Sequence, residues 1–389
     1  MRPRRTGEYV TSTVTGERVR AFVPRPLPPA PPVRLEGELR DRFDAALIAL
    51  GRLDASASRL PDAPLFLYSY VRKEAVLSSQ IEGTQSSLAD LLLWELEEAP
   101  GVPVEDVVEV SQYVAALDHA LGRVRGGFPL SNRLFREAHG LLLAHGRGAG
   151  KAPGEFRRTQ NWIGGSRPGN AAFVPPPPDR VAACMAQLEK FLHDTPQRTP
   201  TVLKAALAHV QFETIHPFLD GNGRIGRLLI TLILCAEKVL SEPLLYLSLF
   251  FRQRRAEYYR RLDSVRADGD WEGWCGFFAD GIVETTASAV GTAVRLDRLF
   301  AEDRARLERL GRGSGSALRV HRSLERRPLA SIAHLATATG LTVPTVTAAL
   351  GRLTDAGITR ELTGRRRNRV FAYESYMRLL NEETVPSQA

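Results

Sequence analysis

Apolar residues recur at helical spacing over most of the chain, and this pattern predicts a mainly α-helical fold. Residues 228–236 are apolar on nearly all sides, which indicates a helix buried inside the protein; nine residues are too few to span a bilayer. Ser131 is expected to cap the helix that follows it. The helices are expected at 35–53, 65–81, 104–124, 131–145, 201–215, 228–236, 252–265 and 271–310.

Two short stretches have the pattern of β-hairpins instead. Residues 8–23 alternate between polar and apolar positions around a turn at Thr15-Gly16-Glu17. The second hairpin is expected within residues 154–174, where a turn-rich stretch precedes a run of four prolines. Between the first hairpin and the first helix, residues 24–32 are proline-rich and predict an extended arm that wraps the surface; a ligand for a proline-binding module is the alternative.

The C-terminal part of the chain reads as a separate unit behind a glycine-serine linker at 311–316. Its pattern predicts three helices followed by two short strands that flank an arginine-rich turn, and this order resembles a winged helix-turn-helix domain. Residues 317–389 contain eleven arginines and six acidic residues, so this part of the chain carries +5 of the total net charge of +8. The expected elements are helices at 317–326, 329–338 and 343–356 and strands at 358–362 and 369–373.

A short break in the helical pattern lies between residues 215 and 228 and carries glycines. Pro217 disfavours helical geometry at His216, so the preceding helix should end there. Gly221 and Gly223 allow turns that other residues resist, and Asn222 is expected to cap the next helix. The start of a helix presents unpaired N–H groups and a positive dipole end, so this stretch is suited to binding phosphate.

Four charged or titratable side chains in this stretch point to the same chemistry. Arg224 and Arg227 are three residues apart and share a helix face toward such an anion. Asp220 is an oxygen ligand suited to Mg²⁺ beside phosphate, and His216 could take a proton from a hydroxyl. Taken singly, each of these has an ordinary structural explanation, as a turn, a helix end or a solvated pair. Together they predict phosphate, metal and base chemistry at one site.

Composition narrows the class of protein. The 389 residues suggest two or three domains, and 43% hydrophobic residues is typical of a globular protein. Nearly all of the basic residues are arginine, so net charge alone is weak support for nucleic-acid binding. Cys184, Cys235 and Cys275 are far apart without metal-ligand spacing, which predicts free thiols in a reducing compartment. No signal peptide or membrane span is recognised, so a cytoplasmic protein without a membrane partner is expected.

Residues 216–227 resemble the signature of the Fic family, His-Pro-Phe-x-Asp/Glu-Gly-Asn-Gly-Arg-x-x-Arg, at all nine specified positions. The resemblance implies transfer of AMP from ATP to a protein hydroxyl, with His216 as base and Asp220 as the Mg²⁺ ligand. It places an anion cradle at 221–224 and makes Arg227 the ligand of the terminal phosphate. The residues expected to bind nucleotide are Gly221, Asn222, Gly223, Arg224, Ile225, Gly226, Arg227 and Tyr258.

A second motif lies at the end of the helix expected at 65–81. Ser78 and Glu82 are four residues apart, and Gly83 is a natural helix stop. By itself this is a solvated glutamate before a helix cap. Beside the Fic signature it resembles the family's inhibitory motif, Ser/Thr-x-x-x-Glu-Gly/Asn. That resemblance implies that Glu82 pairs with Arg227 and denies it to ATP.

The family resemblance also assigns the remaining segments. The expected hairpin within 154–174 resembles the family's flap, which holds a target backbone by strand addition; a lid that only covers the pocket is the alternative. The expected architecture is a Fic-type helical bundle with this flap and a C-terminal winged helix. Its parts are an N-terminal hairpin and arm at 1–34, an inhibitory helical region at 35–120, a catalytic core at 121–310, the linker at 311–316 and the winged-helix domain at 317–389.

Two functions fit the sequence. The first is a protein adenylyltransferase that uses Mg²⁺ and ATP to modify a Ser, Thr or Tyr hydroxyl, with self-modification and AMP removal as further activities. The second is a DNA-binding regulator whose Fic core senses nucleotide with little turnover. Residues 317–380 are the expected DNA contact, although such domains also serve as protein docks. A homodimer is a further expectation, because Fic relatives often dimerise. Phosphate transfer fits less well, because the branch that performs it departs from the Gly-Asn-Gly pattern.

Overall fold

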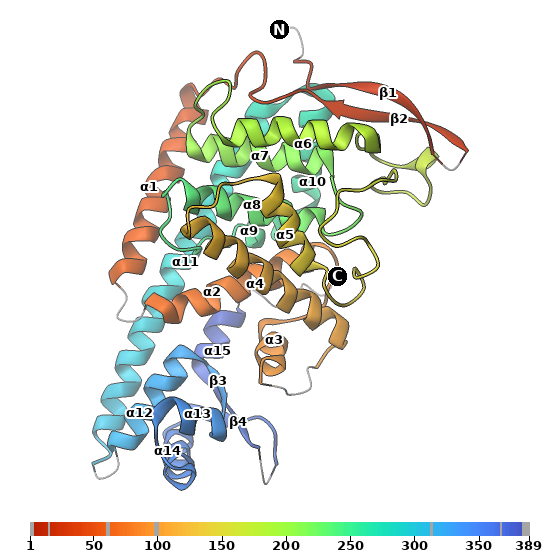
Figure 1. The fold of residues 1–389 in the computed structure, drawn as a ribbon. Helices are drawn as coiled ribbons and strands as arrows, with labels where there is room; N and C mark the ends of the chain where they lie inside the picture. Colours follow the sequence, from red (N-terminus) through yellow and green to blue (C-terminus); the bar gives the residue numbers. More distant parts are fainter. Residues whose placement is uncertain are drawn as a thin grey trace.

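The computed structural model describes residues 4–14, 16–59, 63–96, 101–311, 314–365 and 368–382. The molecule is elongated and mainly helical, with a β-hairpin at one end and a small three-stranded sheet near the other (Figure 1). The mainly α-helical fold class is therefore confirmed. None of the described helices is both long and apolar enough to cross a membrane.

Helices α7 (Thr201–Ile215) and α8 (Asn222–Ala236) pack against each other in antiparallel orientation and form the centre of the core. Every residue of α7 after Thr201 is buried, and twelve of the fifteen residues of α8 are buried. Helices with apolar residues on all faces must be surrounded, and here other helices surround them. The surrounding helices are α2 (Ala63–Ile81), α4 (Val104–Arg125), α5 (Asn132–Leu142), α6 (Pro178–Leu192), α9 (Ser248–Gln253) and α10 (Arg255–Asp268).

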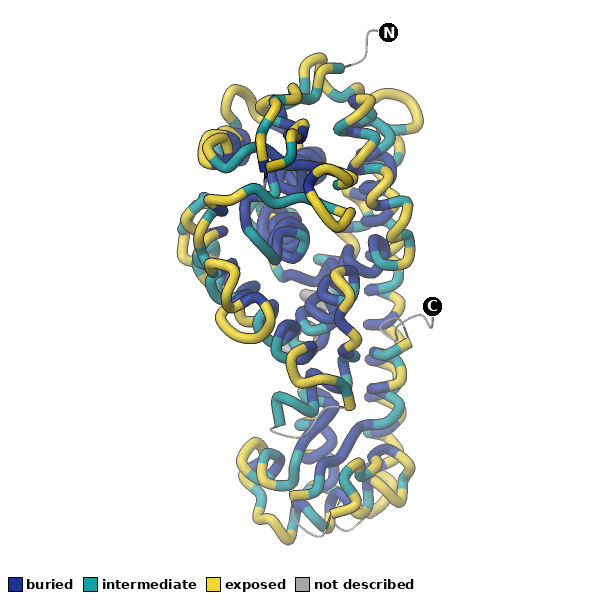
Figure 2. Tube along the Cα trace, turned by 90° about the vertical axis from the view of Figure 1, so that its right-hand side faces the viewer, coloured by how far each residue is buried: buried dark blue, intermediate teal, exposed yellow. Residues whose placement is uncertain are grey.

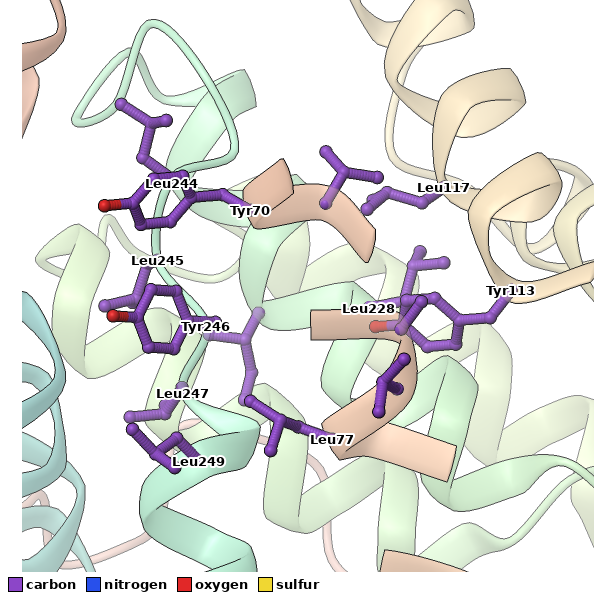
Figure 3. Packing of buried hydrophobic residues seen from close by; sticks show 14 of the residues in the cluster. Tyr70, Leu77, Tyr113, Leu117, Leu228, Leu244, Leu245, Tyr246, Leu247 and Leu249 are labelled. Carbon is purple, nitrogen blue, oxygen red and sulfur yellow. The ribbon is translucent and has the colours of Figure 1, made fainter. Parts of the chain in front are cut away.

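Figure 3 shows how helix α2, which ends next to Glu82, packs into this core. Leu77 of α2 lies in one buried cluster with Tyr113 of α4 and Leu228 of α8. The ring of Tyr246 lies 5.4 Å from that of Tyr70, which is also on α2. Helix α2 is therefore held by apolar packing on several sides, and its C-terminal end is placed against the start of α8.

Several helix ends differ from their predictions by a few residues. Ser131 caps α5 as predicted, since its hydroxyl accepts from the N–H of Leu134. The helix expected at 252–265 is broken at Arg254, which has φ −116° and ψ 39° and separates α9 from α10. A short helix, α3 (Leu88–Trp94), was not predicted; Ser87 and Asp90 form its capping box.

The N-terminal hairpin has the predicted form. Strands β1 (Gly7–Val14) and β2 (Glu17–Pro24) pair in antiparallel register from Gly7↔Pro24 to Val14↔Glu17. Thr15, in the predicted turn, lies outside the described residues. The arm after β2 has no regular structure and leads to α1 (Gly37–Arg59).

The segment within 154–174 that was predicted to form a hairpin does not form regular strands. The described segment has one antiparallel bridge, Ile163↔Phe173, and a short 3-10 helix, η1 (Pro168–Asn170), between the bridged residues. The ladder cannot extend, because residues 164 and 165 are left-handed glycines on one side and prolines begin at 175 on the other. The segment instead joins β2 through Phe22, whose N–H donates to the carbonyl of Val174 at 2.9 Å.

The long helix α11 (Trp271–Glu308) connects the two ends of the molecule. Its 38 residues span about 57 Å, and it packs along α1 in the upper part and against α12 in the lower part (Figure 1). Figure 2 shows buried residues both in the larger upper part of the molecule and in the lower part, with further buried residues between them.

The C-terminal domain is a winged helix, as predicted. Its elements are α12 (Ser314–Arg326), β3 (Leu329–Ser331), α13 (Ile332–Thr339), α14 (Val343–Asp355), β4 (Thr359–Glu361), β5 (Val370–Tyr373) and α15 (Glu374–Asn381), with sheet order β3-β5-β4. Strand β3 lies where a longer second helix was predicted, and Ser331 caps the shortened helix. Strand β3 and helix α15 were not predicted.

The C-terminal domain packs more closely against the rest of the chain than the predicted flexible linker at 311–316 implies. Helix α12 begins at Ser314, inside residues 311–316. The hydroxyl of Tyr373 donates to Asp303 of α11 at 2.6 Å, and the hydroxyl of Tyr376 lies 3.0 Å from that of Ser69 on α2. Phe300 and Leu307 of α11 are buried in the same cluster. Residues of α11 and α2 therefore complete the core of the winged helix.

Candidate active site

The site begins where α7 ends at His216. This residue adopts the left-handed conformation, with φ 49° and ψ 60°, so the helix stops at the predicted position. The predicted cap at Asn222 is wrong: Gly221 is the N-cap, with φ 73°, and Asn222 is the first residue of α8. The side chain of Asn222 instead accepts from the N–H of Phe218 and donates to its carbonyl, at 2.8 and 2.9 Å. It therefore fixes the loop between the two helices.

Two residues that the sequence did not reveal hold this loop in place. Arg157 is buried; its Nε donates to the carbonyl of His216 at 2.9 Å, and its backbone N–H donates to Pro217. His139 stacks on Phe218 with ring centroids 3.7 Å apart, and its Nε2 donates to the carbonyl of Asp220 at 3.0 Å. Each lies more than fifty residues from the loop, so no local pattern marks it.

Helix α8 presents its N-terminus to the carboxylate of Glu82. A Cβ added to Gly223 would lie 2.1 Å from Oε1 of Glu82, so the carboxylate rests on the backbone of this glycine. The first turn of a helix attracts anions through its free N–H groups and its dipole. Glu82 therefore occupies the position at which the sequence predicts an anion cradle.

Arg227 contacts both polar residues of the second motif. Its Nη2 donates to Oε1 of Glu82 at 2.8 Å and to the carbonyl of Ser78 at 2.9 Å, and its Nε donates to the hydroxyl of Ser78 at 2.8 Å. Burial alone would raise the pKa of Glu82, but the Arg227 guanidinium outweighs it and the pKa is lowered. Glu82 is therefore ionised at neutral pH, and Nε and Nη2 of Arg227 are both engaged by the motif. Gly83 follows with φ 103° and ends the segment.

Arg224 and Arg227 do not point to one shared partner. Nη1 of Arg224 lies 3.5 Å from Oε2 of Glu109 on α4, and its Nη2 lies 3.8 Å from Oδ1 of Asp220. Both arginines are buried. The side chain of Asp220 is 45% exposed, and its Oδ1 accepts from the N–H of Gly221 at 2.6 Å. An accessible carboxylate beside a phosphate-binding helix start fits a Mg²⁺ ligand that shares the ion with nucleotide phosphates.

His216 has the properties of a base at neutral pH. Burial lowers its pKa to about 4, and the Arg157 guanidinium acts in the same direction, so the imidazole is neutral. Its Nδ1 is buried and has no hydrogen-bond partner among the described residues. A neutral imidazole can accept a proton at the ring nitrogen that faces a substrate.

Tyr258, predicted to contact nucleotide, is buried in the core. Its hydroxyl lies 2.8 Å from Nε2 of His209, and its ring stacks on Phe251. The neighbouring Tyr259 is 37% exposed, and Glu82 contributes to raising its pKa after burial, the larger cause. Tyr259 is thus the tyrosine of this pair that has an accessible ring near Glu82.

Glu213 is a further buried carboxylate that the sequence did not single out. A Cβ on Gly226 would lie 2.3 Å from its Oε1, and that oxygen has no hydrogen-bond partner among the described residues. Burial raises the pKa of Glu213 to about 7, although Arg227 opposes this shift. Glu213 thus packs closely on Gly226 of α8 and lies about one helical turn before His216.

Comparison with protein families agrees with this arrangement. Residues 41–122 match the Fic/DOC family N-terminal model, and residues 129–234 match the Fic/DOC family model. Residues 315–358 match the winged helix-turn-helix DNA-binding model. The chain therefore carries a Fic domain, with the N-terminal region found in that family before it and a winged helix-turn-helix domain after it.

Curated relatives include proteins named protein adenylyltransferase Fic. The relative from Drosophila grimshawi is 37% identical over 128 residues, which is 33% of this chain and 24% of that protein. The relative from Drosophila mojavensis is 33% identical over 156 residues, or 39% of this chain and 28% of that protein. The chain thus spans about a quarter of the length of these relatives.

Solved structures share the fold at low sequence identity. A Fic family protein from Desulfovibrio desulfuricans G20 matches with TM-score 0.58 and 21% identity, over 88% of this chain and 97% of that chain. A Fic domain-containing signaling protein from Bacteroides thetaiotaomicron VPI-5482 matches with TM-score 0.52 and 20% identity, over 64% and 96% of the two chains.

Proposed function

We propose that this protein is a protein adenylyltransferase that moves AMP from ATP to a hydroxyl side chain of a protein. The observation that carries the proposal is the loop between α7 and α8, where the neutral His216 stands beside an anion-binding helix start and an accessible Asp220. Curated relatives that share up to 37% identity with this chain bear that name. These three features together are suited to phosphate-transfer chemistry.

The proposed reaction follows from these positions. The hydroxyl oxygen of the target attacks the α-phosphorus of ATP, its proton passes to His216, and pyrophosphate leaves. The N–H groups at the start of α8 and Arg224 stabilise the charge on the phosphates. Mg²⁺, bound by Asp220 and phosphate oxygens, would supply further charge neutralisation. The bridged segment at 163–173 lies beside the loop, since Nδ2 of Asn161 donates to the carbonyl of Phe218 at 2.9 Å, and it is proposed to hold the target.

The proposal includes autoinhibition by Glu82. Its carboxylate lies on Gly223 and engages Arg227, two groups that the terminal phosphate of ATP would need. A charge-assisted pair of this kind is strong and well oriented, so ATP would bind in a pose unfit for in-line attack. Hydrolysis of the AMP group from a modified protein, which would release AMP, is a second activity to assay for this site.

Incorporation of labelled AMP into protein tests the proposal. The Glu82→Gly variant is incubated with α-labelled ATP, Mg²⁺ and a cell lysate, with the Glu82→Gly/His216→Ala double variant as the control. Label should appear on lysate proteins, and on the chain itself if it modifies itself, and should fall by ~10²–10⁴-fold in the control because the base is lost. Equal labelling by both variants would remove His216 from the reaction.

A second candidate function is a DNA-binding regulator that uses the Fic core as a nucleotide sensor. The match of residues 315–358 to a winged helix-turn-helix DNA-binding model favours it. A sensor would bind ATP and duplex DNA without labelling any protein, so the same assay separates the two functions. The two are also compatible in one chain, because the site and the winged helix occupy different ends of the molecule (Figure 1).

A further inference from the structure

The bridged segment at 163–173 (the flap) has little regular structure of its own. Its bridge joins Ile163 and Phe173, and η1 turns the chain between them. Within the turn, Oδ1 of Asn170 accepts from the N–H of Arg167 at 2.9 Å. A single bridged pair falls far short of the three or more strands that an independent sheet needs. The flap therefore depends on neighbouring elements for its position.

The base of the flap is packed between the N-terminal hairpin and α10. The ring of Phe173 lies 6.2 Å from that of Phe22 on β2, and Cζ of Arg266 on α10 lies 4.0 Å from the centroid of the Phe173 ring. The N–H of Phe22 donates to the carbonyl of Val174 at 2.9 Å. Val174 also belongs to a small buried apolar cluster with residues of both hairpin strands. Packing of rings and aliphatic groups therefore fixes this end of the flap.

The tip of the flap contacts the carboxylate of Glu17, the first residue of β2. Oε1 of Glu17 accepts from Nη1 of Arg167 at 2.9 Å, and Oε2 accepts from the backbone N–H of Gly169 at 2.8 Å. A Cβ added to Gly169 would lie 2.2 Å from Oε2, so the carboxylate rests directly on the backbone of this glycine. Hydrogen bonds to an ionised carboxylate are short and well oriented, and both oxygens of this carboxylate are used on the flap.

Strand β2 therefore contacts the flap at two separate points. Glu17 and Phe22 are five residues apart, which is about 17 Å along a strand. Figure 1 shows the flap beside the turn end of the hairpin. Two contacts at this separation fix the direction of the flap as well as its place. The chain just before the flap is joined to the loop after α7, since Nδ2 of Asn161 donates to the carbonyl of Phe218 at 2.9 Å. The hairpin thus orients the flap relative to the loop that carries His216.

We infer that Glu17 is a positioning residue for the protein target, because it holds the tip of the flap in the orientation that receives the target beside His216. The inference rests on the proposed function, in which the flap holds the target. Among the described residues, the side chain of Glu17 bonds to Arg167 and Gly169 alone, so it acts through the flap and not on ATP. A flap that must become ordered when the target binds lowers the affinity for that target. The N-terminal hairpin is then part of the target-recognition unit.

Amide hydrogen exchange of the full chain tests whether Glu17 holds the flap. Glu17→Ala removes both contacts, and Gly169→Ala places a methyl group where the carboxylate lies without changing the hairpin. Each variant should speed exchange of the amides at 163–173 by roughly fivefold, the factor that one hydrogen bond contributes. The double variant should exchange no faster than Glu17→Ala, because both changes remove the same contact. Glu8→Ala is the matched control, since Glu8 is exposed on the same hairpin and its side chain bonds to no described residue.

Transfer of labelled AMP tests whether the position of the flap matters to the target. The same variants are made in the Glu82→Gly protein and incubated with α-labelled ATP, Mg²⁺ and serial dilutions of a cell lysate. Glu17→Ala and Gly169→Ala should lower the labelling of dilute lysate by roughly fivefold, and the deficit should shrink as the lysate is concentrated, because target binding and not the chemical step is weakened. Calorimetry with a non-hydrolysable ATP analogue should give the affinity of the Glu82→Gly parent for every variant.

Three results would overturn the inference. The first is flap exchange that is unchanged in both variants, and the second is faster exchange with labelling equal to that of the Glu8→Ala control. The third is reduced labelling without faster exchange, which would make Glu17 a direct contact of the target. If the Glu82→Gly parent labels no protein at any lysate concentration, the proposed AMP transfer fails, whereas the exchange measurement still decides whether Glu17 positions the flap. Circular dichroism of each variant establishes that it is folded.

Discussion

The carboxylate oxygen Oε1 of Glu82 lies 2.8 Å from Nη2 of Arg227, although the two residues are 145 positions apart in the chain. The same oxygen rests against Gly223 at the start of α8. One carboxylate thus contacts both the arginine and the helix start that are proposed to bind the terminal phosphate of ATP.

Replacing Glu82 by Gly is expected to raise AMP transfer by one or more orders of magnitude. The change frees Arg227 and the start of α8, and a misplacement of ~1 Å can cost on the order of 10²-fold in rate. Arg227→Ala should not activate, because it removes the phosphate ligand together with the inhibitory contact. Labelled AMP incorporation is measured for both single variants and the double variant. A Glu82→Gly rate no higher than that of the wild type would end the inhibitory assignment.

Ser78→Ala should activate less than Glu82→Gly. The substitution removes one acceptor of Arg227 but leaves the Glu82 pair and the Ser78 carbonyl contact intact. A hydrogen bond to a charged group contributes about 1.5–3 kcal/mol, or roughly 10- to 150-fold, and a rise at the lower end is expected because the other two contacts of Arg227 remain. Ser79→Ala is the matched control, since the buried Ser79 hydroxyl has no partner among the described residues. Equal effects of the two substitutions would show that α2 packing, and not the arginine contact, is responsible.

The acid limb of the pH profile for AMP transfer should lie below the ordinary histidine range. A base is active above its pKa, and burial lowers the pKa of His216 to about 4. The kcat/KM of the Glu82→Gly variant should therefore be nearly constant from about pH 8 down to pH 6. Removing Glu82 also removes a carboxylate that raises this pKa, so the limb should not move upward. A midpoint near pH 6.5 would contradict the lowered pKa of His216.

Glu213→Gln should stabilise the protein at pH 8 and change it little at pH 5. Burial raises the pKa of Glu213 to about 7, so the folded state holds a proton that the unfolded state releases above about pH 4.5. Stability from this group is therefore lost as pH rises through 7, by at most about 3 kcal/mol. Thermal unfolding at both pH values checks this, with Glu302→Gln on the surface of α11 as the control. An unchanged pH dependence in Glu213→Gln would contradict the prediction.

The winged helix should bind duplex DNA through its wing more than through α14. The exposed positions of α14 are mostly small or apolar, such as Val343, whereas Arg365 and Arg369 flank the wing; Arg366 and Arg367 lie outside the described residues. Arg365→Gln/Arg369→Gln should weaken binding and reduce the slope of log K against log salt by about 2. The full chain is used, because α11 and α2 complete the core of this domain. If no duplex binds in a salt-sensitive manner, protein docking becomes the function of the domain.

The sequence by itself determined the features that depend on neighbouring residues. Helical periodicity fixed most of the helices, and Pro217 with the glycines fixed the break at His216. The signature was recognisable because its nine specified positions lie within twelve residues. The same holds for the cap at Ser131, whose partner is the N–H of Leu134 three residues on. These features use short-range steric and hydrogen-bonding rules, which a linear pattern records.

The tertiary structure alone decided which distant groups meet. Arg157 and His139 hold the loop of His216 from segments more than fifty residues away, and no local spacing marks them. Tertiary packing buries Glu213, which raises the pKa of its carboxyl group to about 7. The same packing places Tyr258 in the core. The flap forms a single bridge, because pairing needs donors that its prolines lack. The winged helix likewise shares its core with α11, because Tyr373 finds its partner in Asp303.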